Sequence, residues 1–139
     1  MAVGQRKGSI MIIAGFIVAI LAALLHVFIF YLESVAWESP RAMATFGTAD
    51  ADAARATKQL AYNQGFYNLF LALLAIGGAV VALLGFLTVG ATLTLAGTGS
   101  MLAAAVVLFV SSSAHRGAAL KQGTVPLVAV VVLAIGLIL

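Results

Sequence analysis

The longest uncharged stretch covers residues 59–114 and reads QLAYNQGFYNLFLALLAIGGAVVALLGFLTVGATLTLAGTGSMLAAAVVLFVSSSA, with no Asp, Glu, Lys or Arg. As one helix it would extend roughly 84 Å, at about 1.5 Å per residue, whereas the hydrocarbon layer of a bilayer is about 30 Å thick. The stretch therefore predicts two membrane helices joined by a turn. We place this turn at residues 87–91, where Gly and Thr cluster.

The composition of the whole chain is also that of a membrane protein. Over 139 residues, 64% of positions are hydrophobic, 8% are charged, and the mean hydropathy is +1.21. About a quarter of the positions in a soluble domain are charged, so this chain lacks the polar side chains that would cover a soluble surface. We predict an all-α integral membrane protein whose main partner is the lipid bilayer.

The charged and metal-binding residue types exclude several other classes. The net charge of +3 does not indicate a nucleic-acid partner, because the Lys and Arg residues flank apolar runs and are placed to contact lipid head groups. The absence of cysteine excludes disulfides and thiolate metal sites. His26 and His115 are far apart and have no close ligand pair, so we predict no cofactor and no metal site.

Apolar runs and polar breaks divide the chain into helices. The run at residues 10–32 is interpreted as a retained first helix, because it is too long for the core of a signal peptide. Ser39 followed by Pro40 is typical of a helix start and predicts a short interfacial helix ending near Gly47, after which Thr48 can cap the next helix. The membrane helices are predicted at about residues 10–35, 49–86, 91–113 and 119–139, in a single domain covering residues 1–139.

The Lys and Arg residues also predict an orientation, since cytoplasmic loops carry more of them. Arg6 and Lys7 precede the first helix, whereas the first and third loops together hold a larger group: Arg41, Arg55, Lys58, Arg116 and Lys121. This distribution favours a multi-pass protein of the cell membrane with its first and third loops in the cytoplasm.

Polar side chains lie on one face of the predicted first helix. On a helical wheel, His26, Glu33 and Trp37 fall on the same stripe as the small residues, and the large aliphatic residues fall opposite. Membrane helices pack through small residues, so we expect this stripe to face the other helices. His26 and Glu33 are the candidate residues for proton transfer, because both are ionisable and lie on this inner stripe.

A second polar group lies in the predicted second helix. Its segment Asn-Gln-Gly-Phe-Tyr-Asn, residues 63–68, places three polar side chains on one face with small residues further along. Both helices meet the first loop on one side of the membrane, where the third loop also emerges. We therefore predict a polar pocket between the first two membrane helices, open to that side, with these ligand-binding residues: His26, Glu33, Trp37, Asn63, Gln64, Tyr67, Asn68 and Gln122.

The chain resembles a known family along its whole length. The residues that carry the resemblance are His26, Glu33, Trp37, the pair 40–41, Phe46, the pair 57–58, the segment 63–68 and the pair 122–123. Their order and spacing are similar to the bacterial four-helix membrane proteins grouped as domain of unknown function 1304. The resemblance implies the four-helix architecture and this inner residue set, and it implies no reaction.

Three functions fit these residues. The first is a protein, assembled as a homo-oligomer, that binds or transports a small polar or amphipathic ligand while Glu33 and His26 exchange protons. The second is an intramembrane enzyme in which the same two residues transfer a proton on a lipophilic substrate, as an isomerase does. The third is a structural or interaction protein whose polar side chains only specify helix pairing.

Overall fold

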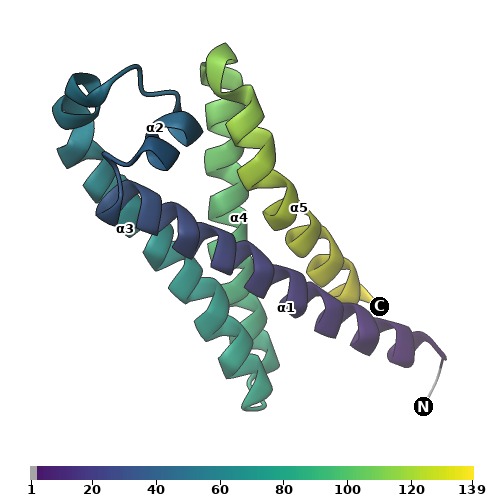
Figure 1. Cartoon of the computed structure of the whole chain (residues 1–139). Coiled ribbons are helices and arrows are strands. Elements are labelled where there is room, and N and C mark those ends of the chain that lie inside the picture. The colour runs from purple at the N-terminus through teal and green to yellow at the C-terminus, as the bar shows by residue number, and fades with distance from the viewer. Residues whose placement is uncertain (1–2) are drawn as a thin grey trace.

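A computed structural model describes residues 3–139 of the chain, which form helices joined by short connections (Figure 1). No strand occurs in this part of the chain, and four helices are long and apolar enough to cross a membrane. The predicted all-α class, with four membrane helices and a short helix in the first loop, is confirmed. The elements are α1 (Val3–Phe30), a π-helical turn (Tyr31–Val35), α2 (Pro40–Phe46), α3 (Ala51–Leu83), α4 (Leu87–Ser111), a 3-10 turn (Ser113–His115) and α5 (Arg116–Ile138).

The four long helices form a ring in which each packs mainly against two others (Figure 1). α3 and α4 form an antiparallel hairpin, and α4 packs against α5. α1 completes the ring by contacting α5 along its first half and α3 along its second half, and it barely touches α4. The last turns of α1 are therefore positioned chiefly by α3.

Local sequence explains the helix ends in the first loop. Ser39 caps α2 by accepting a backbone hydrogen bond at 3.1 Å, with Pro40 in the first turn, as predicted. α2 ends at Gly47, whose φ of 69° lies in the left-handed region. The cap of α3 is Asp50 rather than the predicted Thr48, because the Asp50 carboxylate accepts two backbone hydrogen bonds, at 3.0 and 2.8 Å, where the helix dipole favours an anion.

Three other helix ends differ from the predicted bounds. α1 begins at Val3 rather than near residue 10, since the helix continues through polar residues that were counted as a flank. The turn between α3 and α4 centres on Gly85, with a φ of 97°, and therefore precedes the predicted residues 87–91. α5 begins at Arg116, directly after the 3-10 turn, so the third loop is shorter than predicted.

Small residues form the contacts between helices. The buried side chains are mainly alanines, and α3 and α4 approach so closely that a Cβ atom at Gly90 would lie 2.5 Å from the carbonyl oxygen of Gly78. Such close packing drives helix association where lipid replaces water. The large side chains of α1 and of the π-helical turn that were predicted to face lipid are exposed: Ile13, Ile17, Leu21, Leu24, Phe28 and Val35.

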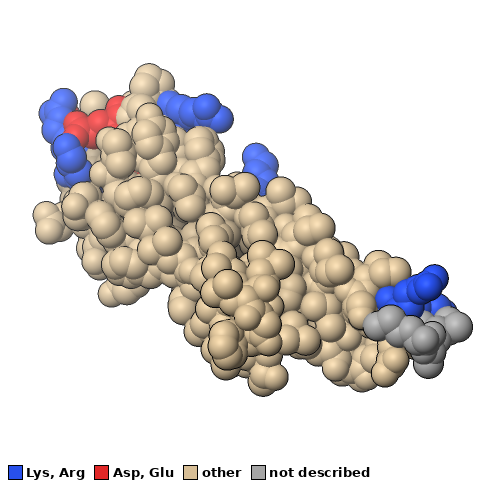
Figure 2. All heavy atoms as spheres, turned by 90° about the horizontal axis from the view of Figure 1, so that it is seen from below, with Lys and Arg blue, Asp and Glu red and all other residues tan. Residues whose placement is uncertain are grey.

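Charged side chains lie toward the ends of the bundle. On the face shown in Figure 2, Lys and Arg lie at both ends and along one edge, while Asp and Glu gather at one end. At the loop end, His115 Nε2 donates a hydrogen bond at 3.3 Å to the carbonyl of Phe46, and Ser112 Oγ donates to its Nδ1 at 2.7 Å. This contact brings the first and third loops together, and their location in the cytoplasm stays a prediction.

Candidate functional site

α1 continues directly into the π-helical turn Tyr31–Val35, and this turn carries Glu33. The Ala36 amide donates to the carbonyl of Tyr31 at 2.9 Å, the spacing of five residues that defines a π turn. Two consecutive side chains are buried within it, with Leu32 1% exposed and Glu33 4% exposed. Single π turns are rare in proteins, and those that exist are frequently found at functional sites. The turn at Tyr31–Val35 therefore identifies Glu33 as the centre of a candidate site.

An amide from the neighbouring helix holds Glu33. Asn68 of α3 donates through Nδ2 to Oε2 of Glu33 at 2.8 Å, and also to the backbone carbonyl of Gln64 at 3.3 Å. Within residues 3–139, no Lys, Arg or His lies within salt-bridge distance of Glu33. The carboxyl group is thus buried beside a neutral partner. Acidic groups in such positions are costly in a membrane and usually serve a function.

Gly65 allows α3 to approach the π turn. A Cβ atom at this position would overlap the Ser34 hydroxyl and lie 3.0 Å from Cβ of Glu33. Ser34 Oγ donates to the carbonyl of Tyr62 at 2.8 Å, which ties the turn to α3 beside the Asn68 contact. The sequence prediction missed both Gly65 and Ser34. The glycine inside the 63–68 segment could have indicated close helix contact, whereas Ser34 has no comparable signal.

Trp37 links the segment that follows the π turn to the neighbouring helices. Its Nε1 donates to the carbonyl of Ala54 on α3 at 2.9 Å, and its ring lies against Phe46 of α2, with the ring centroids 5.3 Å apart. The indole is half-buried. Trp37 therefore links the chain after α1 to both α2 and α3 and forms one side of the site.

A hollow of about 150 Å³ adjoins these residues, and its charged lining consists of Glu33, Glu38 and Lys58. Lys58 Nζ donates to Oε1 of Glu38 at 2.7 Å, and this hydrogen bond, together with the positive charge, lowers the pKa of the Glu38 carboxyl. Glu38 and Lys58 thus compensate each other, which leaves Glu33 as the acidic lining residue that faces no counter-charge. The remaining lining residues are Ser34, Val35, Ala36, Trp37, Ser39 and Tyr62.

His26 lies two helical turns before Glu33 and is 2% exposed. Its Nδ1 donates to the carbonyl of Ala22 at 2.8 Å, so in a neutral ring Nε2 is the acceptor. In the described part of the chain no hydrogen bond joins His26 to Glu33. No three His, Asp or Glu side chains among residues 3–139 are grouped so that they could hold a metal ion.

The side chains of the other predicted site residues on α3 and α5 make no hydrogen bond to Glu33 or Asn68 in the described part of the chain, and they do not line the hollow. Asn63 and Gln64 are exposed, and Tyr67 is 61% exposed, which corrects the wheel that turned Gln64 and Tyr67 inward. Gln122 is half-buried on α5, and the described structure gives its side chain no hydrogen bond. Because close packing requires small residues, the inward face of α3 is instead set by its buried small residues: Ala61, Gly65, Ala72, Ala75, Gly78 and Ala79.

Comparison with known proteins identifies a family. Residues 20–134 match the family described as "Protein of unknown function (DUF1304)". This range includes Glu33, Asn68 and the hollow beside them. No curated protein and no solved structure matches the chain.

Proposed function

The chain belongs to the DUF1304 family, and from its site we propose that it binds an amphipathic molecule by a positively charged amine head group. The observation that carries this proposal is the Glu33 carboxyl group, which is buried beside the neutral amide of Asn68. A buried carboxylate without a counter-charge is unfavourable, and a ligand cation placed against it would offset that cost.

The shape and lining of the hollow suit such a head group. Trp37 and Tyr62 line it, and the faces of aromatic rings attract cations. Its volume of about 150 Å³ corresponds to roughly five water molecules in the liquid, which is room for an amine but not for a hydrocarbon chain. The apolar part of the ligand would therefore remain in the surrounding lipid.

The charges of the lining favour a cation over an anion. Among the lining residues, Glu33 and Glu38 are acidic and Lys58 is basic, and Glu38 also pairs with Arg55, which in turn pairs with Asp52. With these five groups ionised, the three acidic residues exceed the two basic ones by one negative charge. An ammonium group would restore neutrality. An anionic head group would instead place a second negative charge beside a buried carboxylate, which is strongly unfavourable in a medium of low dielectric constant.

We propose binding rather than proton transfer, because the expected proton partner does not contact Glu33. His26 Nδ1 donates to the carbonyl of Ala22 in its own helix, and no hydrogen bond between His26 and Glu33 is present in the described structure. A general acid or base must lie within hydrogen-bond reach of the proton that it transfers. A reaction that used both residues would therefore need Glu33 and His26 to reach one bound substrate. The contacts of His26 give no support to that arrangement.

Trp37 provides a direct test, because it is the only tryptophan in the chain and lines the hollow. The purified protein in phosphatidylcholine nanodiscs is titrated with dodecylamine while tryptophan fluorescence is recorded. Dodecanol has the same tail without the charge. We expect a saturable change with dodecylamine and none with dodecanol. Glu33→Gln keeps the shape of the side chain and should raise the Kd for dodecylamine by about tenfold or more, as for a lost hydrogen bond to a charged group.

Asp52→Asn is the matched control, since it removes one negative charge from the same end of the molecule without touching the lining. Its Kd for dodecylamine should stay close to that of the unmodified chain. Equal affinity of the unmodified chain and Glu33→Gln would refute the role of Glu33. An equal, saturable response to dodecanol would refute recognition of a charged head group.

A further inference from the structure

A stripe of exposed side chains runs along the outer face of α3 and takes no part in the Glu33 site. It consists of Leu60, Asn63, Tyr67, Phe70 and Leu74, and is called the heptad stripe below. The alternating spacing of three and four residues is that of the contact positions in a coiled coil. Leu60 is 71% exposed, Tyr67 61%, Phe70 54% and Leu74 39%, and Asn63 is also exposed.

We infer that the heptad stripe is the interface through which two copies of this chain pair in the membrane. Helices with contact positions at this spacing pack side by side along a continuous seam, in lipid as in water. A two-fold axis along the membrane normal would place the two α3 helices parallel, at equal depth. Each residue of the stripe would then face the same region of the second copy.

Asn63 is the reason to choose a second copy rather than lipid as the occupant. A side-chain amide both donates and accepts hydrogen bonds, so two Asn63 side chains related by a two-fold axis satisfy each other. Lipid tails can cover the four apolar and aromatic members of the stripe but cannot bond to the amide. A single Asn among apolar contact positions also fixes the register and number of paired helices.

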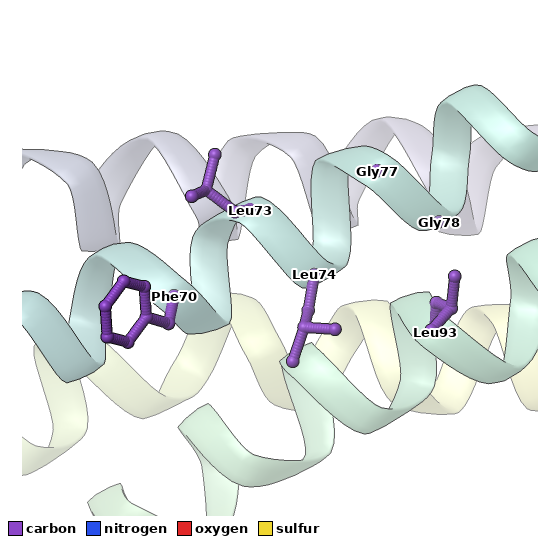
Figure 3. Close-up of a pocket in the computed structure, with 6 residues that line it drawn as sticks. All are labelled: Phe70, Leu73, Leu74, Gly77, Gly78 and Leu93. Atoms are coloured by element: carbon purple, nitrogen blue, oxygen red, sulfur yellow. The ribbon is translucent and has the colours of Figure 1, made fainter.

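A hollow beside the stripe offers space for side chains of the second copy. It measures about 240 Å³ and is lined by Phe70, Leu73, Leu74, Gly77, Gly78 and Leu93, between α3 and α4 (Figure 3). Gly77 continues the spacing of the stripe, and a Cβ atom there would meet no other atom within 4 Å. With both helices at equal depth, the Phe70 or Leu74 side chain of a second copy would enter this space, as a coiled-coil residue enters a gap in the facing helix.

Single cysteines test the interface cleanly, because the chain has none of its own. Tyr67→Cys and Leu74→Cys lie on the stripe, and Val80→Cys is the control, since Val80 is 49% exposed on α3 but lies off the stripe and does not line the hollow. Membranes with each variant at low density are treated with copper phenanthroline. Disulfide-linked dimers should form at least about fivefold faster at positions 67 and 74 than at 80, because a disulfide needs adjacent Cβ atoms.

Two further outcomes decide the proposal. Asn63→Leu should lower the dimer association constant by about threefold, the effect of one interhelical hydrogen bond in a membrane. Equal rates at all three cysteine positions, or cross-links to other proteins without homodimers, would overturn the pairing through α3. Since the dodecylamine titration does not depend on dimerisation, either outcome leaves the amine-binding proposal standing.

Discussion

The two halves of α1 are packed by similar means but in different surroundings. In the first half, a Cβ atom at Gly15 would lie 2.7 Å from Cα of Leu133 in α5. In the second half, the glycine belongs to the neighbour: Gly65 of α3 lies against Ser34 and Glu33. Both contacts rely on a missing side chain to bring helices together. Around the first contact all neighbours are backbone or aliphatic, whereas the second contact places a carboxyl group and its amide partner.

The difference shows where this bundle can carry a polar site. The contact between α1 and α5 is closed by the backbone itself, so nothing there can move without separating the helices. At the other end, the contact between the helices is formed by the π winding and by the Ser34 side chain rather than by closely packed backbone. This arrangement leaves room for the hollow beside Glu33. We interpret the first half of α1 as the part that stabilises the fold, and the second half as the part available for binding.

The largest expected effect comes from a substitution that disrupts the apolar contact between α1 and α5. Gly15→Ala puts a methyl group onto the backbone of α5, and because backbone cannot rotate away, the helices must separate. We expect a loss of about 3 kcal/mol in the free energy of unfolding, at the upper end for overpacked sites. The free energy of unfolding is measured by titrating the protein in mixed micelles with dodecyl sulfate while circular dichroism monitors the loss of helix. Gly99→Ala is the control, since a Cβ there meets no atom within 4 Å, and unchanged stability of Gly15→Ala would contradict the comparison.

The second expected effect distinguishes the two glycine contacts. Gly65→Ala should cost about 2 kcal/mol, because its Cβ meets the Ser34 hydroxyl and the π turn. In the Gly65→Ala, Ser34→Ala double variant the hydroxyl is gone, and the next atoms that the added Cβ meets are Cβ of Glu33 at 3.0 Å and the Ser34 amide nitrogen at 3.1 Å. The double variant should therefore be more stable than the sum of the two single losses predicts. A double-mutant cycle in the same micelles measures this coupling. No coupling would show that the contact at Gly65 is as rigid as the one at Gly15.

The third expected effect comes from replacing the polar contact between Glu33 and Asn68 with an apolar one. Asn68→Leu removes the amide that donates to Glu33 and should lower stability by about 1.5 kcal/mol, since a buried acceptor is left without its donor. Replacing both residues, Glu33→Leu with Asn68→Leu, should restore much of that loss, because no buried polar group remains. Unfolding measurements check the stability, and dodecylamine titration should show binding lost in the double variant. A double variant less stable than Asn68→Leu would contradict this view.

The sequence predicts the apolar half better than the polar half, for physical reasons. The bilayer fixes helix length and selects small residues for contacts, so the four helices and the lipid-facing side of α1 follow from hydropathy and a wheel. The polar half departs from both rules. A wheel assumes uniform α-helical winding, which the π turn at Glu33 changes locally. It also takes polar residues as inward, although Gln64 and Tyr67 are exposed on α3. Glu33 and Asn68 belong to the predicted set, but their contact depends on Gly65 and Ser34.

The smallest expected effect concerns the surface beside the polar half. The hydrogen bond and charge of Lys58 lower the pKa of Glu38 below its ordinary value of 4.5. Because the folded state holds the lower value, this pair stabilises the fold above pH 4.5, and the contribution disappears as the pH falls through the lowered pKa. The effect should be small, since both side chains are exposed to solvent. Unfolding titrations of the unmodified chain and Lys58→Gln, at pH values between about 3 and 6, should show a stability difference that shrinks toward the acid end. Comparing the two chains cancels the pH dependence of all groups that the substitution leaves unchanged. A difference that stays constant with pH would therefore mean that Lys58 stabilises the loop end through packing rather than through charge.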